Sequence, residues 1–161
     1  SIEQNEHPVV IRMPGGALVS GGKAVTKDFG RLNTYEIKEK GAKVAVIGLG
    51  SFYPLGEQAA ALIKEKTGVQ PTLINPYYIT GVDTDLLESL KAEHDVVITL
   101  EDGVLDGGFG EKIARFYGDS DMKVLNFGLK KEFLDRYDVD EVLKDNHLTA
   151  EQIAEDVEKV L

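Results

Sequence analysis

Hydrophobic and polar positions follow two different patterns along most of the chain. Short apolar runs, bounded by charged residues, glycine or proline, predict strands over residues 34–39, 43–48, 71–75, 95–100 and 122–127. Apolar residues spaced three or four apart predict helices over residues 54–66, 83–94 and 110–117, and two more helical segments end the chain. Strands that alternate with helices in this way predict a three-layer α/β/α fold, with a mainly parallel sheet of about five strands and helices on both faces.

The first 33 residues differ in composition from the rest. Residues 1–7 are polar, begin without methionine and resemble the end of a helix that continues upstream. A strand is predicted over residues 8–13, and the turn-forming residues of 20–33 predict a linker. We therefore expect two parts, residues 1–33 at the end of a preceding domain and residues 34–161 as the α/β domain.

Composition narrows the class of protein. The chain has 161 residues, of which 42% are hydrophobic and 29% are charged, as expected for a soluble globular domain. Its formal net charge of −10 is spread along the chain, which argues against nucleic acid or an anionic membrane as partner, because both attract clustered lysine and arginine. No apolar run approaches the roughly 20 residues of a membrane span. The absence of cysteine excludes thiol catalysis, disulfides and thiolate metal sites, and favours a cytoplasmic protein.

An acidic, glycine-rich segment follows the apolar run of residues 96–100 and carries the candidate chemistry. Its members are Glu101, Asp102, Gly107, Gly108 and Gly110. Glycines at this density let the backbone adopt positive φ and approach a partner or ligand closely. Glu101 lies where the carboxyl end of a central strand faces a crevice, so it is a candidate for acid–base chemistry. The alternative role is structural, with the carboxylate accepting backbone hydrogen bonds that hold the glycine turn.

Two tyrosines, Tyr77 and Tyr78, follow the strand predicted over residues 71–75. Aromatic side chains with a polar tip are favoured at contact surfaces, so both are candidates for one. The alternative is that one ring packs in the core and the other is exposed.

Other motifs are incomplete. The sequence Gly-Leu-Gly-Ser over residues 48–51 lies where a Rossmann phosphate loop would lie, but Tyr53 replaces its third glycine and no acidic residue follows about 20 residues later. We interpret it as a tight turn that leads into a helix. No Gly-x-Ser-x-Gly elbow occurs. His7, His94 and His147 are scattered without ligand spacing, and His94 is expected at a helix end on the surface. We therefore expect no complete catalytic site and no metal or cofactor site in this chain.

Four segments occur in an order that is typical of one family. They are residues 44–51, residues 71–79 with 82–83, residues 97–103 and residues 107–110. In this order they resemble the C-terminal domain of transketolase-like, thiamine-diphosphate enzymes. The end of the chain, residues 124–129 with Phe133 and the acidic helix after it, is most similar to the 1-deoxy-D-xylulose-5-phosphate synthases. Residues 8–16 resemble the last strand of a preceding pyrimidine-binding domain, so the resemblance covers nearly the whole chain.

The resemblance implies a part of a larger transferase. Such enzymes bind thiamine diphosphate and Mg²⁺ between two upstream domains, across a homodimer interface, with a catalytic glutamate and a Gly-Asp-Gly metal motif. None of these elements lies in this chain, so the fragment is expected to bind no thiamine diphosphate and to be inactive alone. Its implied role is to support the dimer beside the upstream cofactor-binding domains and to border the substrate entrance. The candidates for that entrance or interface are Tyr77, Tyr78, Glu101, Asp102, Gly107, Gly108 and Gly110.

Two positions depart from the synthase pattern. Gly15 and Tyr77 lie where synthases usually have arginines that are expected to hold the substrate phosphate. Neither glycine nor tyrosine forms the bidentate, charge-assisted hydrogen bonds of arginine. We therefore hypothesise that the parent enzyme prefers another acceptor or has lost affinity for phosphate.

Three functions are left for comparison. The first is a domain of a transketolase-like transferase, which transfers a two-carbon ketol unit or joins a decarboxylated 2-oxo acid to an aldehyde. The second is the β component of a 2-oxo-acid dehydrogenase, which shares this domain, although the synthase-like end of the chain counts against it. The third is a non-catalytic assembly or binding module that uses residues 107–110 as its interface.

Overall fold

The computed structural model describes residues 8–10 and 28–161. The chain divides into the units Ser1–Gly30 and Arg31–Leu161, and every helix and strand of the described residues belongs to the second unit. The strand predicted over residues 8–13 is absent from residues 8–10, and the rest of it lies outside the described residues, as does Gly15. No helix in the described ranges is long and apolar enough to cross a membrane. The domain boundary predicted at residue 33 stays a prediction.

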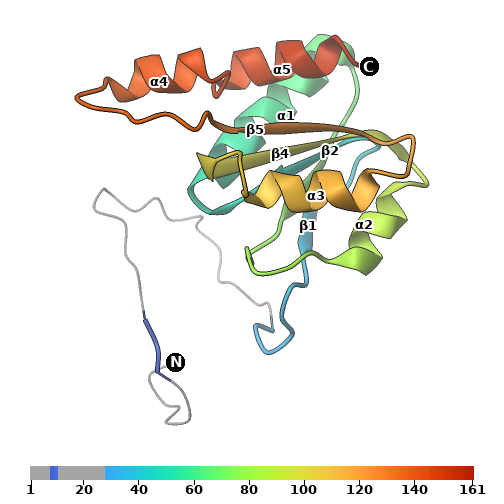
Figure 1. The fold of residues 1–161 in the computed structure, drawn as a ribbon. Coiled ribbons are helices and arrows are strands. Elements are labelled where there is room, and N and C mark those ends of the chain that lie inside the picture. The colour runs from blue at the N-terminus through green and yellow to red at the C-terminus, as the bar shows by residue number, and fades with distance from the viewer. Residues whose placement is uncertain (1–7, 11–27) are drawn as a thin grey trace. The chain divides into compact units, whose positions relative to one another are not determined.

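Five strands of the described residues form one sheet in the order β1-β3-β2-β4-β5 (Figure 1). They are β1 (Glu36–Glu39), β2 (Lys43–Gly48), β3 (Thr72–Asn75), β4 (His94–Val104) and β5 (Lys123–Leu129). The pairs β2–β3, β2–β4 and β4–β5 are parallel, and β1 pairs antiparallel with β3 at one edge. The predicted sheet, mainly parallel and of about five strands, is confirmed.

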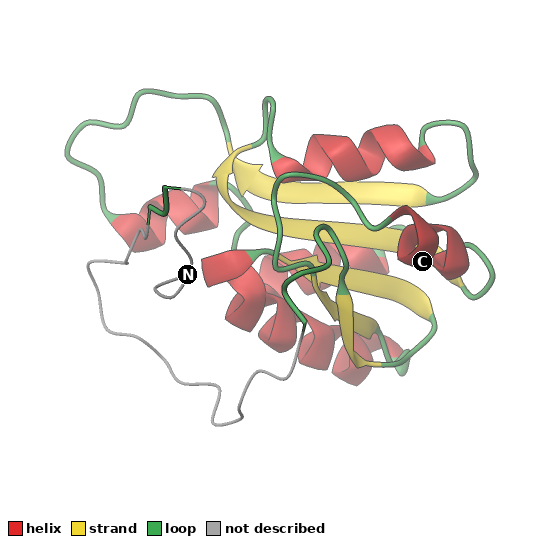
Figure 2. Cartoon of the chain, turned by 90° about the horizontal axis from the view of Figure 1, so that it is seen from below, coloured by secondary structure: helices red, strands yellow, loops and turns green. Residues whose placement is uncertain are grey.

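Helices cover both faces of this sheet, which confirms the predicted three-layer α/β/α fold (Figures 1 and 2). They are α1 (Tyr53–Thr67), α2 (Thr84–Leu90), α3 (Phe109–Tyr117), α4 (Val139–Asp145) and α5 (Ala150–Glu158), and the short 3-10 helix η1 (Gly50–Phe52) precedes α1. Helices α1 and α5 pack together on one face, and α2 and α3 lie on the other.

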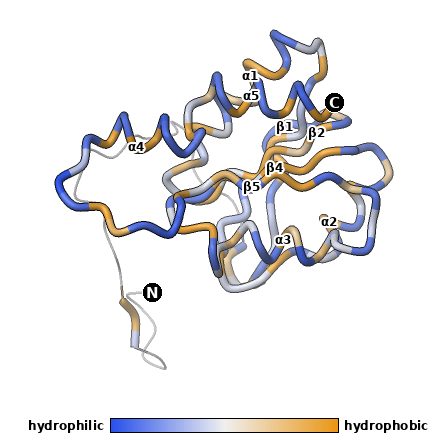
Figure 3. Tube along the Cα trace, turned by 45° about the horizontal axis from the view of Figure 1, so that its top comes forward, coloured by the Kyte–Doolittle hydropathy of each residue, from blue (hydrophilic) through white to orange (hydrophobic). Residues whose placement is uncertain are grey.

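Successive side chains of the strands supply two apolar clusters, one under each layer of helices. On β2, Val44 and Val46 pack in the cluster of α1 and α5. Ala45 and Ile47 pack in the cluster of α2 and α3. All four side chains are fully buried, as expected for a central parallel strand that is covered on both faces. Figure 3 accordingly shows the hydrophobic colour concentrated along the strands inside the domain.

Residues at the ends of two helices fix where those helices begin and end. Helix α1 has a proline in its first turn and is capped at its C-terminus by Gly68, whose φ of 74° lies in the left-handed region. Asp83 precedes α2, and its Oδ1 accepts a hydrogen bond from the Leu86 N–H at 3.0 Å. Its Oδ2 accepts a second bond from the Tyr35 N–H at 2.8 Å. Asp83 therefore also joins the start of α2 to the segment before β1.

Helix α2 is shorter than predicted, and His94 is placed differently as a result. The helix predicted over residues 83–94 ends at Leu90, and β4 begins at His94. The expected surface position of His94 was wrong, because the ring is buried between two polar partners. Its Nε2 lies 2.8 Å from Oγ1 of Thr72, and its Nδ1 lies 3.0 Å from the Leu90 carbonyl oxygen. Burial lowers the pKa of His94, which favours the neutral ring.

Candidate functional site

The carboxyl ends of the parallel strands bring three of the sequence-predicted segments to one edge of the sheet. Strand β2 ends at Gly48, β3 ends at Asn75, and the part of β4 that pairs with β2 ends at Leu100. Strands β2 and β4 are neighbours, and the helices that follow them lie on opposite faces of the sheet. In open α/β sheets, ligands bind outside the carboxyl ends of the strands at such a switch point. We call this surface the carboxyl edge.

Glu101 lies at the carboxyl edge and closes the N-terminus of α3. Its side chain is 3% exposed. Its Oε2 accepts a hydrogen bond from the Phe109 N–H at 2.7 Å, and its Oε1 accepts one from the Gly110 N–H at 2.8 Å. The first N–H groups of a helix have no partner within it and lie at the positive end of its dipole, so a carboxylate is a matched cap. The predicted structural role of Glu101 is confirmed, because its carboxylate accepts the backbone hydrogen bonds that hold the glycine turn.

Contacts within the domain leave no room for a side chain at Gly108 and Gly110, and the backbone conformation favours glycine at position 107. A Cβ added to Gly108 would lie 2.5 Å from Oε2 of Glu101, and one added to Gly110 would lie 2.7 Å from Oγ1 of Thr99. Gly107 has a φ of 76°, in the left-handed region that favours glycine. At Gly108 and Gly110 the close approach inferred from the glycine content is thus made by side chains of the same domain.

Asp102 is exposed and contacts η1, the 3-10 helix that follows β2. The Ser51 hydroxyl donates a hydrogen bond to Oδ2 of Asp102 at 3.0 Å. Beside it, the Leu49 N–H donates to the Leu100 carbonyl oxygen at 2.9 Å. Together these bonds join the ends of β2 and β4. Sequence reasoning missed this role of Ser51, because the two residues are 51 positions apart and no local pattern pairs them.

Tyr77 and Tyr78 are both half-buried, so the alternative of one core ring and one exposed ring was wrong. Tyr77 has a φ of 57°, and its N–H donates a hydrogen bond to Oδ1 of Asn75 at 3.1 Å. Its hydroxyl donates to Oε2 of Glu36 at 2.6 Å, and Nζ of Lys38 lies 5.5 Å from its ring centroid. Burial, followed by the hydrogen bond to Glu36, raises the pKa of Tyr77. These contacts keep Tyr77 against β1, at the carboxyl edge.

The residues that hold the tyrosine loop were also missed by sequence reasoning. Glu36 and Lys38 form an ion pair at 2.8 Å beside Tyr77. Lys112 of α3 donates a hydrogen bond from Nζ to the Ile79 carbonyl oxygen at 2.5 Å, which joins this loop to α3. The period-two alternation of β1 was the available signal for the ion pair, since it places Glu36 and Lys38 on one face of a strand. No comparable signal pointed to Lys112.

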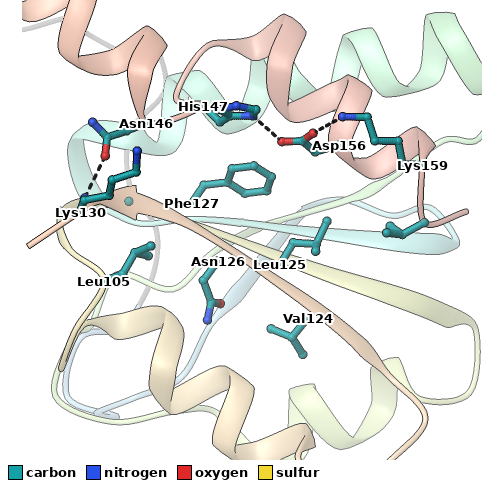
Figure 4. Close-up of a pocket in the computed structure, with 12 residues that line it drawn as sticks. Leu105, Val124, Leu125, Asn126, Phe127, Lys130, Asn146, His147, Asp156 and Lys159 are labelled. Carbon is teal, nitrogen blue, oxygen red and sulfur yellow. Dashed lines mark hydrogen bonds and ion pairs between the residues drawn. The ribbon is translucent and has the colours of Figure 1, made fainter.

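A groove of about 490 Å³ lies away from the carboxyl edge, along β5 (Figure 4). Residues Val124–Gly128 line it, together with residues at the ends of α4 and α5, and we call it the β5 groove. Asp156 lies in its wall, where Oδ2 is 2.8 Å from Nδ1 of His147 and Oδ1 is 2.7 Å from Nζ of Lys159. Partial burial acts to raise the pKa of Asp156, but the hydrogen bonds from Lys159 and His147 outweigh it and leave that pKa lowered. No predicted site residue lines the groove.

Comparison with known proteins finds relatives that match nearly the whole chain. Residues 33–153 match the family described as transketolase, C-terminal domain. The chain is 31% identical over 158 residues to the 1-deoxy-D-xylulose-5-phosphate synthase of Clostridium tetani (strain Massachusetts / E88). The aligned region covers 97% of this chain and 25% of the synthase. It is 30% identical over 167 residues to 1-deoxy-D-xylulose-5-phosphate synthase 2 of Kitasatospora griseola, and that alignment covers 100% of this chain and 26% of the relative. The chain therefore spans about a quarter of the length of these curated relatives.

Solved transketolase structures share the fold. A split-gene transketolase, solved as an inactive beta4 tetramer, superposes with a TM-score of 0.68 at 20% identity, over 79% of this chain and 41% of that one. The transketolase of Campylobacter jejuni subsp. jejuni NCTC 11168 superposes with a TM-score of 0.55 at 18% identity, over 79% of this chain and 18% of the transketolase chain. At these identities the likeness supports the fold alone.

Proposed function

Because this chain belongs to the transketolase C-terminal domain family and is homologous to 1-deoxy-D-xylulose-5-phosphate synthases, we propose that it is the C-terminal domain of a transferase of that type. The observation that carries the proposal is the extent of the match, which takes in 97% of this chain but 25% of the Clostridium tetani synthase. In this role the chain packs beside upstream cofactor-binding domains, supports a homodimer and borders the substrate entrance of a cytoplasmic enzyme.

The reaction that we propose for the parent enzyme is the transfer of a two-carbon ketol unit, or the joining of a decarboxylated 2-oxo acid to an aldehyde. Thiamine diphosphate with Mg²⁺ supplies the carbanion chemistry of such a reaction when it is bound. The described residues of this chain are not suited to bind thiamine diphosphate or Mg²⁺. They include no group of three His, Asp or Glu residues placed to hold a metal ion. Glu101 already occupies the α3 amides that would otherwise suit a diphosphate. We therefore assign the cofactor to the upstream domains.

The carboxyl edge is the surface that we assign to the substrate entrance. Its loops are held by bonds within the domain, since Glu101 fixes the start of α3 and the Ser51–Asp102 hydrogen bond joins the ends of β2 and β4. Loops that are held in this way form a wall that keeps its shape when a substrate or another domain approaches. Tyr77 and Tyr78 follow the neighbouring strand, β3, and belong to the same wall.

The surroundings of Tyr77 support the hypothesis that the parent enzyme holds no substrate phosphate at this position. The Tyr77 hydroxyl donates to the Glu36 carboxylate, so the position presents an acidic group where a phosphate would need a cation. Lys38 is the neighbouring cation, but its ammonium group pairs with Glu36 at 2.8 Å. Binding of glyceraldehyde 3-phosphate to the parent enzyme with ordinary, synthase-like strength would contradict this hypothesis.

Restoration of the enzyme tests the proposed function. The coding region upstream of Ser1 is sequenced, and the segment that it encodes is co-expressed with this chain. We expect that segment to contain further α/β domains with a Gly-Asp-Gly metal motif. With thiamine diphosphate and Mg²⁺ added, the purified pair should form a ketol-transfer product such as 1-deoxy-D-xylulose 5-phosphate, whereas either part alone should form none. An upstream region without those domains, or clear calorimetric binding of thiamine diphosphate to this chain alone, would overturn the proposal.

The two other functions receive less support. The matched relatives at about 30% identity are synthases, which favours the synthase type over the β component of a 2-oxo-acid dehydrogenase. An assembly module was suggested by the glycines of residues 107–110. Gly108 and Gly110 are instead explained by close contacts with Glu101 and Thr99 within the domain.

A further inference from the structure

Residues 131–141, which we call the arm, are left uncovered by the rest of the domain. Every residue of the arm is exposed. Four of its exposed side chains are large and apolar, namely Phe133, Leu134, Tyr137 and Val139. Phe133 is 97% exposed, although burial of a phenylalanine side chain is worth about 2 kcal/mol. Apolar side chains that gather on one exposed segment mark an interaction surface.

The base of the arm is fixed beside the β5 groove. The Lys130 N–H donates a hydrogen bond to Oδ1 of Asn146 at 2.9 Å, and Nζ of Lys130 lies 3.4 Å from the Asp145 carbonyl oxygen. Lys130 and Asn146 also line the groove (Figure 4). From this end of the groove the arm extends past the end of β5 before the chain returns in α4 (Figure 1).

The β5 groove follows the outer edge of a sheet. Leu125 and Phe127 pack toward α1 and α5, whereas Val124 packs toward α2 and α3. Side chains directed to both faces of β5 line the same groove, so the groove runs around the outer edge of the strand. Within the described residues, β5 pairs with β4 and with no other strand. An open strand edge binds an extended segment through backbone hydrogen bonds and side-chain pockets. Residues 131–138 of the arm form no helix or strand and suit that mode of binding.

The arm and the groove carry opposite charge. The arm contains five acidic and two basic residues. The charged residues that line the groove are Lys130, Lys159 and Asp156, with His147 beside them. An acidic arm therefore fits this groove, in a chain whose net charge of −10 otherwise opposes contact between two copies.

We propose that the arm of one copy of this chain lies in the β5 groove of a second copy, and that the exchange is reciprocal. Each copy carries both the arm and the groove at the same end of β5, so one two-fold axis satisfies both contacts, as in a closed isologous dimer. Phe133 is the anchor, because an aromatic side chain that fills a pocket carries much of the energy of an interface. This inference deepens the proposed function and rests on it, since it names the surface that forms the homodimer.

Sedimentation equilibrium of the full chain is the first test. We expect a dimer for the wild-type chain and for the control Leu32→Ser, because Leu32 is 70% exposed but lies in neither the arm nor the groove. Phe133→Ser should weaken the dimer by about ten-fold or more, as the loss of a central aromatic anchor does. A wild-type chain that stays monomeric at every concentration, or two variants that weaken the dimer equally, would overturn the proposal.

Cross-linking is the second test, and it uses the absence of cysteine from the chain. Phe133→Cys and Val160→Cys chains are purified separately, mixed and treated with a short bis-maleimide. Val160 lines the groove, so we expect cross-linked pairs that contain one chain of each kind. A mixture of Leu32→Cys and Val160→Cys serves as the control and should give none. Loss of the first product, or equal yields in the two mixtures, contradicts the placement of the arm.

The restored enzyme separates failure of this inference from failure of the proposed function. Maleimide labelling of Phe133→Cys is measured on the chain alone and on the complex with the upstream segment. If the chain is monomeric, and the cysteine is protected only in an active complex, the arm covers the upstream domains; this inference is then overturned while the proposed function stands. If the chain dimerises and cross-links as expected but the complex is inactive, the arm exchange stands and the proposed function fails.

Discussion

The carboxyl edge and the arm both lie at the ends of strands of the same sheet, but buried hydrogen bonds hold the first, whereas the contacts of the second are exposed. Near the end of β4, both carboxylate oxygens of Glu101 accept hydrogen bonds from the first amides of α3, and Ser51 donates one to Asp102. After β5, every residue of the arm is exposed, and the bonds between Lys130 and Asn146 or Asp145 lie at its base. The comparison teaches that in this domain glycine content does not mark the uncovered surface, because the glycine turn is packed against Glu101 whereas the large apolar side chains of the arm are exposed.

Loss of the Glu101 cap should have the largest effect of the changes that test this comparison. Glu101→Ala leaves two buried amide donors without partners, so we expect a loss of about 3 kcal/mol in the free energy of unfolding. Urea unfolding of the full chain measures it. The control, Asp102→Ala, removes an exposed carboxylate and should cost about 0.5 kcal/mol or less. Equal losses in the two variants would mean that the carboxyl edge is not held by Glu101.

A methyl group at Gly108 should have the next largest effect. Its Cβ would lie 2.5 Å from the buried Glu101 carboxylate, and moving that carboxylate weakens both hydrogen bonds to α3. We expect Gly108→Ala to cost about 2 kcal/mol in the same unfolding measurement. A Cβ on Gly103 would lie 3.7 Å from the same carboxylate, so the matched control Gly103→Ala should cost only about 0.5 kcal/mol. A cost for Gly108→Ala no larger than that of its control would show that the turn has room for a side chain.

The pH dependence of stability tests the interior at the opposite edge of the sheet. Burial lowers the pKa of His94 in the folded chain, whereas the unfolded chain keeps a value near 6.5. The unfolded chain therefore binds the proton more readily, and stability should fall as the pH drops below about 6.5 toward the folded pKa. Urea unfolding at several pH values should show a shallower decline in that window for His94→Gln. Above pH 7 the two chains should depend equally on pH, and equal declines below pH 6.5 would contradict the burial of a neutral ring.

Changes in the arm should have the smallest effect on folding. Phe133 is 97% exposed, so Phe133→Ser should alter the free energy of unfolding by about 0.5 kcal/mol or less, as other exposed substitutions do. The measurement is made at chain concentrations where the wild type is monomeric, with Leu32→Ser as the control. A loss as large as that of Glu101→Ala would show that the arm is held by its own domain.

Sequence patterns were sufficient to predict the layers of the fold but insufficient to predict the contacts at the carboxyl edge. Strand β2 is predicted at its observed bounds, Lys43–Gly48, because covering both faces of a strand requires a continuous apolar run. The strand predicted over residues 95–100 continues to Val104 in the structure, so Glu101 lies within β4, and the sequence leaves two roles open for it. The choice between them depended on amides eight and nine residues later, whose positions are set by the turn.

The failures have a common physical cause. Strand β4 begins at His94, whose ring bonds to Thr72 of β3, a strand that is not adjacent to β4 in the sheet and lies 22 residues earlier in the chain. The arm was not anticipated either, because its apolar residues lie next to a predicted acidic helix and the apolar pattern does not state what they pack against. Both the β5 groove and the Ser51–Asp102 contact unite segments that are distant in sequence.

The sequence by itself determined the alternation of strands and helices, the class of sheet and the family, because these follow from local periodicity and from motifs in a fixed order. Only the tertiary structure decided that Glu101 is a helix cap, that His94 is buried and that Phe133 is not. Each of these facts depends on which distant groups meet in space, and the pattern along a single chain does not contain that pairing.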